Sequence, residues 1–176
     1  MRKPILEKRR ALSENQKALS DKLICSKLEK LLLDEFKEKE HFLCYYPLKD
    51  EINLIPLYEK MLENGKKLYF PKTFGTDMEF YKVFSLEEFE RGSFNVMEPV
   101  ICDEERIFTG LEAVGIIPGA VFDTELNRIG YGKGYYDRYL GKKPQIVKIA
   151  ACYKFQLVNK IEAKPWDVKM DFLVTD

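Results

Sequence analysis

Short apolar runs alternate along this chain with segments of helical periodicity, and this alternation constrains the fold more than any other feature. Strands are predicted at residues 42–46, 67–72, 78–84, 112–118, 146–153 and 172–175. Helices are predicted at residues 2–11, 13–34 and 54–64, at a short segment from residue 85, and after residue 134. This order favours a mostly parallel sheet with helices on both faces. We therefore expect a single α/β domain over residues 1–176, a Rossmann-like three-layer α/β/α fold.

Several local signals set the ends of these elements. Ser13 and Gln16 form a capping-box pattern at the start of the second helix, and Gly65 suits the residue after the third. Pro71 is expected to stop the strand at 67–72, while residues 94–102 lack periodicity and predict a loop. The second helix carries an apolar stripe made of Leu19, Leu23, Leu28, Leu31 and Leu32.

Composition narrows the class of function. Lysine plus arginine equals aspartate plus glutamate at 29 each, which argues against a general nucleic-acid binder. With His41 as the single histidine, histidine metal sites and Ser/His/Asp catalysis are disfavoured. No apolar run reaches membrane-spanning length and no signal peptide opens the chain, so we expect a cytoplasmic monomer. Reduced thiols without C-x-x-C spacing agree with this: Cys25, Cys44, Cys102 and Cys152.

The stretch at residues 128–140, RIGYGKGYYDRYL, carries the strongest chemical signal. Its three glycines leave backbone N–H groups uncovered before a helix, an arrangement that holds phosphate. Lys133 adds a point charge and Arg128 a planar fork. Asp137 follows Lys133 by four residues, the spacing of one helix face, and suits Mg²⁺ beside phosphate. A glycine-rich turn in which Asp137 only caps the helix remains the alternative to a nucleotide-phosphate site.

Two further charged segments have both a structural and a functional interpretation. Asp50 and Glu51 follow the strand at 42–46, and ligands of open α/β sheets bind at the carboxyl ends of strands. The alternative is a loop carboxylate that helps to cap the next helix near Asn53. A basic cluster near the N-terminus is favoured as a solvated helix face: Lys3, Lys8, Arg9 and Arg10.

Residues 118–123 (PGAVFD) and 127–140 (NRIGYGKGYYDRYL) closely resemble the signature of the 5-formyltetrahydrofolate cyclo-ligase family, also called 5,10-methenyltetrahydrofolate synthetases. Asp50-Glu51, Pro71-Lys72 and Pro165-Trp166-Asp167 extend the resemblance to essentially the whole chain. The resemblance implies that MgATP drives conversion of 5-formyltetrahydrofolate to 5,10-methenyltetrahydrofolate, with release of ADP and phosphate. In that reaction the formyl oxygen attacks the γ-phosphate, N10 closes the ring and phosphate leaves.

The resemblance also implies roles for individual residues. ATP is expected on Arg2, Lys3, Arg128, Ile129, Gly130, Tyr131, Gly132, Lys133, Gly134, Tyr135 and Tyr136. The folate is expected on Tyr46, Glu51, Tyr131, Gly132, Lys133, Gly134 and Tyr135. Lys133, Arg128 and Tyr135 are the expected catalytic residues, and Asp137 with Asp167 the expected Mg²⁺ ligands. Glu51 suits the N–H groups of a pterin; Tyr46 could stack on the folate or belong to the core.

One departure and two alternatives remain. Relatives begin with Lys-x-x-Leu-Arg; here the arginine falls on Arg2 and the lysine would precede Met1, so Lys3 is the candidate substitute. A phosphotransferase on the same scaffold with another acceptor would share the phosphate site. A non-catalytic nucleotide- or folate-binding module is disfavoured, because paired carboxylates such as Asp137 and Asp167 are costly without a cation.

Overall fold

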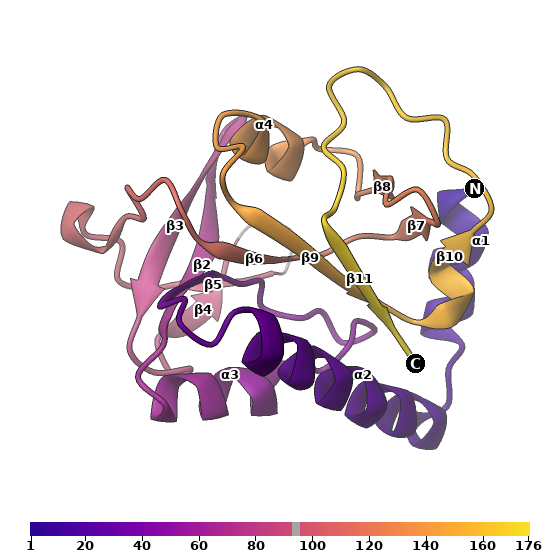
Figure 1. Cartoon of the computed structure of the whole chain (residues 1–176), viewed down its shortest axis with the longest axis horizontal. Coiled ribbons are helices and arrows are strands. Elements are labelled where there is room, and N and C mark those ends of the chain that lie inside the picture. Colours follow the sequence, from indigo (N-terminus) through magenta and orange to yellow (C-terminus); the bar gives the residue numbers. More distant parts are fainter. Residues whose placement is uncertain (93–95) are drawn as a thin grey trace.

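A six-stranded sheet forms the centre of the computed structural model, which describes residues 1–92 and 96–176 (Figure 1). Five strands are parallel, and β3 is antiparallel to its neighbour β2. The predicted mostly parallel α/β sheet is therefore confirmed. The order across the sheet is β11 (Phe172–Thr175), β9 (Val147–Cys152), β6 (Val114–Ile117), β1 (His41–Leu43), β2 (Lys67–Phe74) and β3 (Asp77–Val83).

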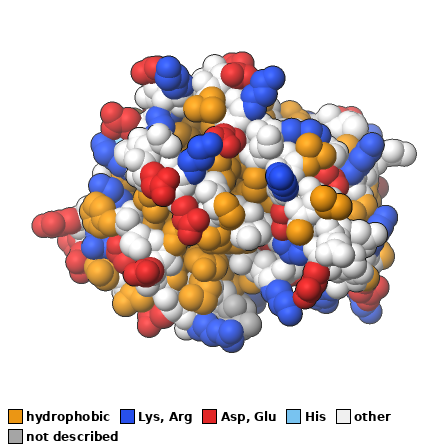
Figure 2. Space-filling view, turned by 90° about the horizontal axis from the view of Figure 1, so that it is seen from below, with side chains coloured by type: hydrophobic (Ala, Val, Ile, Leu, Met, Phe, Trp, Pro, Cys, Tyr) orange, Lys and Arg blue, Asp and Glu red, His pale blue; other side chains and the backbone are white. Residues whose placement is uncertain are grey.

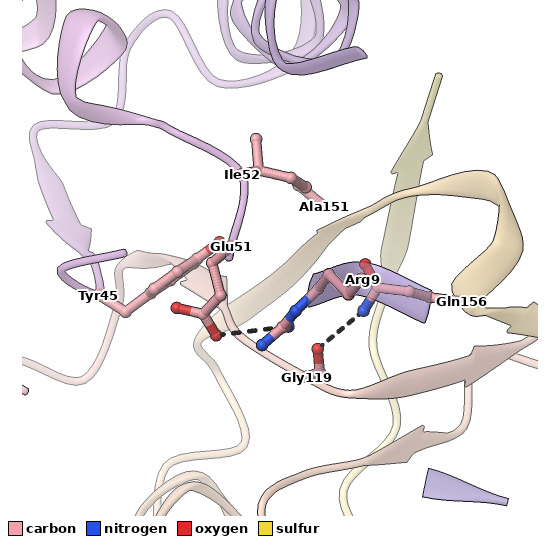
Figure 3. Close-up of a pocket in the computed structure, with 7 residues that line it drawn as sticks. All are labelled: Arg9, Tyr45, Glu51, Ile52, Gly119, Ala151 and Gln156. Carbon is pink, nitrogen blue, oxygen red and sulfur yellow. Dashed lines mark hydrogen bonds and ion pairs between the residues drawn. The ribbon is translucent and has the colours of Figure 1, made fainter. Parts of the chain in front are cut away.

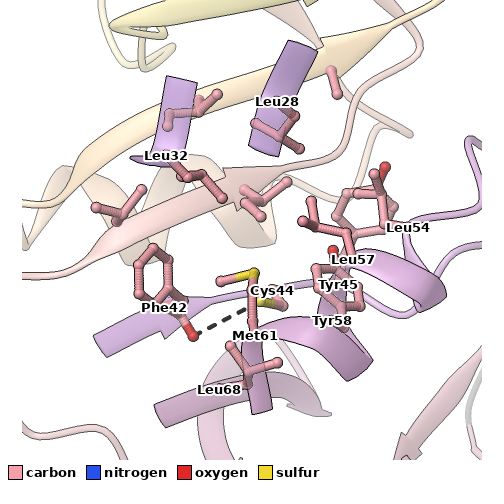
Figure 4. Close-up of a cluster of buried hydrophobic side chains, with 14 of the residues drawn as sticks. Leu28, Leu32, Phe42, Cys44, Tyr45, Leu54, Leu57, Tyr58, Met61 and Leu68 are labelled. Atoms are coloured by element: carbon pink, nitrogen blue, oxygen red, sulfur yellow. Dashed lines mark hydrogen bonds between the residues drawn. The ribbon is translucent and has the colours of Figure 1, made fainter. Parts of the chain in front are cut away.

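Helices cover both faces of this sheet, as predicted. In β1, Phe42 belongs to the apolar cluster that packs under α2 (Glu14–Glu35) and α3 (Ile55–Glu63), shown in Figure 4. Leu43 points the other way, into the cluster that contains Tyr139 and Leu140 of α4 (Tyr135–Gly141). This alternation follows from the two-residue period of a strand. The outer face of the α2 and α3 layer mixes charged and apolar side chains (Figure 2).

The N-terminal helix α1 (Arg2–Arg10) packs on a separate small sheet instead of the central one. Ile5 and Leu6 of α1 contact the apolar cluster of this small sheet. Its strands, in spatial order, are β10 (Leu157–Val158), β7 (Val121–Asp123) and β8 (Arg128–Ile129). Two single-turn 3₁₀ helices complete the region after β5 and the region after β9: Glu104–Arg106 and Lys154–Gln156.

The prediction that Pro71 ends its strand is wrong, since β2 continues to Phe74. The Cys44 amide donates to the Tyr69 carbonyl at 2.7 Å, so the polar groups of Tyr69 face β1. Those of Pro71, two residues further on, face the same side. There β1 has already ended, at Leu43, so the missing N–H costs no ladder bond.

The predicted short helix from residue 85 is also wrong; residues 85–88 form a turn. The Glu88 carboxylate accepts the amides of Phe84 and Ser85 at 3.0 and 3.1 Å, which fixes that turn. The next residues pair as the two-stranded sheet β4 (Phe89–Arg91) and β5 (Met97–Pro99), within the predicted loop 94–102. Three-residue strands are too short to show an alternating pattern. Residues 94 and 95 of that loop lie outside the described residues.

In α2 the Ser13–Gln16 capping box is confirmed, but the predicted apolar stripe is only half correct. Leu28 and Leu32 are buried, while Leu19 and Leu23 are 72% and 46% exposed. The buried face runs instead through Asp21, Ile24, Leu28 and Leu32. Asp21 can occupy it because its carboxylate accepts the Tyr153 hydroxyl at 2.6 Å.

The four cysteines carry free thiols, Cys44 and Cys152 buried and the other two half-buried, as expected. Over the described ranges, no helix combines the length and apolarity needed to cross a bilayer.

Candidate active site

The candidate site lies where the carboxyl ends of β1 and β6 meet. Along the chain, the sheet extends from β1 to β2 in one direction and from β6 to β9 in the other. The neighbouring pair β1 and β6 is therefore the topological switch point, where open α/β sheets bind ligands. The loop that follows β1 carries Asp50 and Glu51, so the predicted position of these carboxylates is confirmed.

A buried charged network lies at this point (Figure 3). Arg9 of α1 is only 3% exposed, and its Nε and Nη2 lie 3.0 and 2.9 Å from Asp50 Oδ2. Arg9 Nη1 donates to the Tyr131 hydroxyl at 2.9 Å and lies 3.8 Å from Glu51 Oε1. The Tyr131 hydroxyl donates to Glu51 Oε1, and the Leu48 amide donates to Glu51 Oε2 at 2.8 Å. Both carboxylate oxygens of Glu51 are thus held by the protein.

Burial shapes the electrostatics of this network. It raises the pKa of the Glu51 carboxyl above the usual 4.5, and the Tyr131 hydrogen bond and the Arg9 charge only partly oppose that rise. Burial likewise raises the pKa of Tyr131, so its hydroxyl stays protonated and can donate. The adjoining cavity, lined in part by Arg9, Glu51 and Gln156, holds about 10 Å³, roughly the room of one water molecule.

Sequence reasoning missed Arg9, which it assigned to a solvated basic face. Lys3, Lys8 and Arg10 are exposed as expected, so the error concerns Arg9 alone. A signal was present: Arg9 follows the apolar Ile5 by four residues and Leu6 by three, which places it on the buried face of α1.

The glycine-rich loop places Lys133 outside the following helix. Gly132 and Gly134 have positive φ angles of 96° and 68°, and α4 starts only at Tyr135. The prediction that Lys133 and Asp137 share a helix face is therefore wrong. Arg2 of α1 reaches this loop as expected, since its Nη1 donates to the Gly130 carbonyl at 3.2 Å. Lys3, predicted beside it, is exposed.

The far end of the loop is fastened to the β2–β3 turn. The Tyr135 hydroxyl donates to the Gly75 carbonyl at 2.8 Å, and Arg138 Nε donates to the Thr76 carbonyl at 3.1 Å. Arg138 Nη1 also donates to the Lys133 carbonyl at 2.9 Å. The loop therefore spans from α1 on one side to the β2–β3 hairpin on the other.

Arg128 lies beneath the loop, not on its surface. Its side chain is buried, Nη2 lies 2.8 Å from Asp137 Oδ1, and Nη1 donates to the Pro118 carbonyl at 3.2 Å. A Cβ atom at Gly130 would come within 2.8 Å of Arg128 Nη1, so the glycine lies directly over the guanidinium. Its charge also lies 5.7 Å from the Tyr136 ring centre. The neighbouring Ile129 pairs with β7 as part of β8.

The two predicted metal ligands belong to segments that contact each other. The Val168 amide donates to Asp137 Oδ1 at 3.3 Å, and Asp167 Oδ2 accepts the Lys164 amide at 2.8 Å. No group of three His, Cys, Asp or Glu side chains suited to a metal occurs within residues 1–92 and 96–176. Mg²⁺ in nucleotide sites takes one or two carboxylates and completes its shell with phosphates and water. Two aspartates on touching segments fit that requirement.

Tyr46, predicted to contact the folate, lies at the border of the apolar core. It is half-buried, and its ring centre lies 4.8 Å from that of Phe89 in β4. One side of the ring is therefore already packed.

Comparison with known proteins agrees with the site. The model of the 5-formyltetrahydrofolate cyclo-ligase family matches residues 1–176. A 5-formyltetrahydrofolate cyclo-ligase of Mycoplasma pneumoniae is 34% identical over 178 residues, which cover 100% of this chain and 96% of the relative. The solved 5,10-methenyltetrahydrofolate synthetase of Aquifex aeolicus has a TM-score of 0.81 and 36% identity, over 99% of this chain and 87% of that one. The chain therefore belongs to the 5-formyltetrahydrofolate cyclo-ligase family and is an enzyme of that class.

Proposed function

We propose that this enzyme uses MgATP to convert 5-formyltetrahydrofolate to 5,10-methenyltetrahydrofolate, releasing ADP and phosphate. One observation carries the proposal: Glu51, the carboxylate suited to a pterin, is joined through the Tyr131 hydroxyl to the glycine-rich loop suited to phosphate. Two substrates that must react with each other therefore have adjoining sites.

ATP is assigned to the loop and its surroundings. The backbone amides of residues 129–136, bent by Gly132 and Gly134, offer donors to phosphate oxygens. Lys133 on the exposed side supplies a positive charge, and Arg128 adds its own from beneath Gly130. Arg2 holds the Gly130 carbonyl from α1, and Lys3 extends the positive charge of that helix.

The folate is assigned to the side of the loop that faces Glu51. An ionised carboxylate accepts the N–H groups of a pterin ring, and Tyr46 at the core border offers an aromatic face. The present cavity of about 10 Å³ is too small for a bicyclic ring. We infer that Tyr131 leaves Glu51 when the folate binds, which the flanking glycines Gly130 and Gly132 permit.

The chemistry follows from this placement. The formyl oxygen of the folate attacks the γ-phosphate of ATP, and ADP leaves; N10 then attacks the activated carbon, and phosphate departs with the former formyl oxygen. Such a transfer needs positioning and charge neutralisation more than a protein nucleophile. Lys133 and Arg128 neutralise charge on the transferred group, and Tyr135 positions the loop end near the formyl group. Mg²⁺ held by Asp137 and Asp167 would neutralise the nucleotide phosphates when bound.

The direct test is to mix the purified protein with 5-formyltetrahydrofolate and MgATP and to follow the absorbance of the methenyl product. We expect product to form only when both substrates are present. Absence of product while ATP binding persists, measured by calorimetry, would contradict the proposal. It would favour a phosphotransferase that uses a different acceptor on this scaffold.

A further inference from the structure

Helix α1 contacts the glycine-rich loop at two levels, and the deeper contact has no assigned role in the reaction. Arg2 Nη1 donates to the Gly130 carbonyl, and Arg9 Nη1 donates to the Tyr131 hydroxyl. Seven residues separate the two arginines, about two helical turns, so both project from one face of α1. The helix thus lies along the loop and touches both of its first two residues.

Arg9 has more partners than its burial alone requires. A buried guanidinium needs a charged partner, and Asp50 supplies one through two contacts of 2.9 and 3.0 Å. The remaining arm, Nη1, is directed away from Asp50, toward the Tyr131 hydroxyl and Glu51 Oε1. Figure 3 shows the guanidinium facing the Glu51 carboxylate across the small cavity. One side chain therefore joins the loop after β1 to the glycine-rich loop.

We propose that Arg9 is a positioning residue that holds the Glu51 carboxylate in place for the folate and couples the folate site to the phosphate loop. This inference rests on the proposed function, which assigns the pterin to Glu51. When the folate displaces the Tyr131 hydroxyl, Arg9 and the Leu48 amide remain to orient the carboxylate. The released Tyr131 can then move with the phosphate loop, so folate binding changes the ATP site.

The charged and titratable groups around Glu51 come from several elements. Arg9 approaches from α1, Tyr131 from the glycine-rich loop and Asp50 from the same loop as Glu51. Tyr45 and Tyr136 also interact electrostatically with Glu51. Arg9 is the cation among these five groups, so its removal shifts Glu51 toward the protonated form, which cannot accept a second N–H.

The test compares Arg9→Gln with the matched control Arg10→Gln in steady-state kinetics. Arg10 is the adjacent arginine; its side chain is 67% exposed and its Nε lies 3.9 Å from Asp50. For Arg9→Gln we expect the KM for 5-formyltetrahydrofolate to rise about 10- to 100-fold, with a much smaller rise in the KM for ATP. Arg9→Lys, which keeps the charge but not the fork, should recover part of the loss. Arg10→Gln should leave both constants unchanged.

Two readouts separate positioning from a merely structural role. The pH below which the folate KM rises should move upward in Arg9→Gln by about one unit or more. In a double-mutant cycle, Arg9→Gln and Tyr131→Phe should be non-additive, because both act through Glu51. Equal increases of the two KM values with an unmoved pH profile would overturn the inference.

Failure of the proposed function is visible separately, because the wild-type protein would then make no methenyl product. If Arg9→Gln does not fold, as judged by thermal unfolding, Arg9→Lys and Tyr131→Phe provide the same pH and cycle comparisons. A folate KM for Arg9→Lys that equals the wild-type value at every pH would then overturn the inference.

Discussion

The two edges of the central sheet treat charge in opposite ways. At the amino edge, where parallel strands begin, charged side chains pair on the surface: Lys67 with Glu40 at 2.7 Å, and Lys39 with Glu112 at 2.8 Å. At the carboxyl edge Arg9 and Glu51 are 3% and 5% exposed and belong to one connected network. Exposed pairs are screened by water, whereas a buried network must satisfy each of its members.

The comparison teaches where charge has a functional role in this protein. Partners at the carboxyl edge come from distant parts of the chain, since Arg9 and Tyr131 are 122 residues apart. Bringing such groups together in a dry site costs solvation, and a packed apolar core would avoid that cost. We therefore expect substitutions at the carboxyl edge to affect catalysis strongly and substitutions at the amino edge to affect it little.

Lys133→Ala should have the largest effect. Removing the cation nearest the expected phosphates should lower turnover by about 100-fold or more, because charge on the transferred group is no longer neutralised. Rates are measured by methenyl absorbance at saturating substrates. An unchanged midpoint of thermal unfolding would confirm that the fold survives, and turnover within a few-fold of wild type would contradict the role of Lys133.

Asp137→Asn should lower turnover by a similar or smaller factor and raise the Mg²⁺ concentration needed for half-maximal rate. Asparagine keeps an oxygen for Arg128 and for the Val168 amide, so the fold should persist. If the variant unfolds without ligands while its Mg²⁺ requirement stays unchanged, Asp137 serves as the partner of Arg128 and caps its helix instead of holding a metal.

Glu51→Gln should raise the KM for 5-formyltetrahydrofolate about 10- to 100-fold and leave the KM for ATP nearly unchanged. The amide keeps one acceptor but loses the charge that favours pterin N–H groups. Fluorescence or calorimetric binding of ATP without folate provides the control. Equal losses for both substrates would exclude a specific pterin contact.

The pH dependence of folate binding offers a smaller and more specific effect. Burial raises the pKa of Glu51 above 4.5, so on acidification its carboxylate is protonated earlier than that of an exposed glutamate. The folate KM should therefore rise as pH falls through that raised pKa, and Glu51→Gln should abolish this rise. The same sign holds for stability, because a raised folded-state pKa favours folding below the unfolded pKa and loses that contribution as pH increases. A pH-independent KM in the wild type would contradict the assignment.

Glu40→Gln, at the amino edge, should have the smallest effect. The hydrogen bond from Lys67 and its charge lower the pKa of Glu40, so any stabilisation is present above the unfolded pKa and lost as pH falls through the lowered one. Because the pair is fully exposed, turnover and both KM values should be unchanged at neutral pH. A loss of turnover would show that the two edges do not differ as described.

Much of the fold follows from local pattern, but contacts between distant segments decide the rest. Helix periodicity and the Ser13 capping box predicted α2 within one residue of its observed end. Pro71 could not be placed without knowing that β1 ends before it, and the burial of Arg9 depends on Asp50, 41 residues away. The glycine loop was identifiable from its composition, whereas the position of Arg128 beneath it was not.

The central claim is that the formyl oxygen attacks ATP, and the most direct measurement follows that oxygen. The enzyme is supplied with 5-formyltetrahydrofolate labelled with ¹⁸O in the formyl group, together with unlabelled MgATP in ordinary water. Released phosphate is then analysed by mass spectrometry. We predict one ¹⁸O atom in each phosphate and one ADP for each methenyl product. Methenyl product accompanied by unlabelled phosphate would contradict phosphorylation of the formyl oxygen.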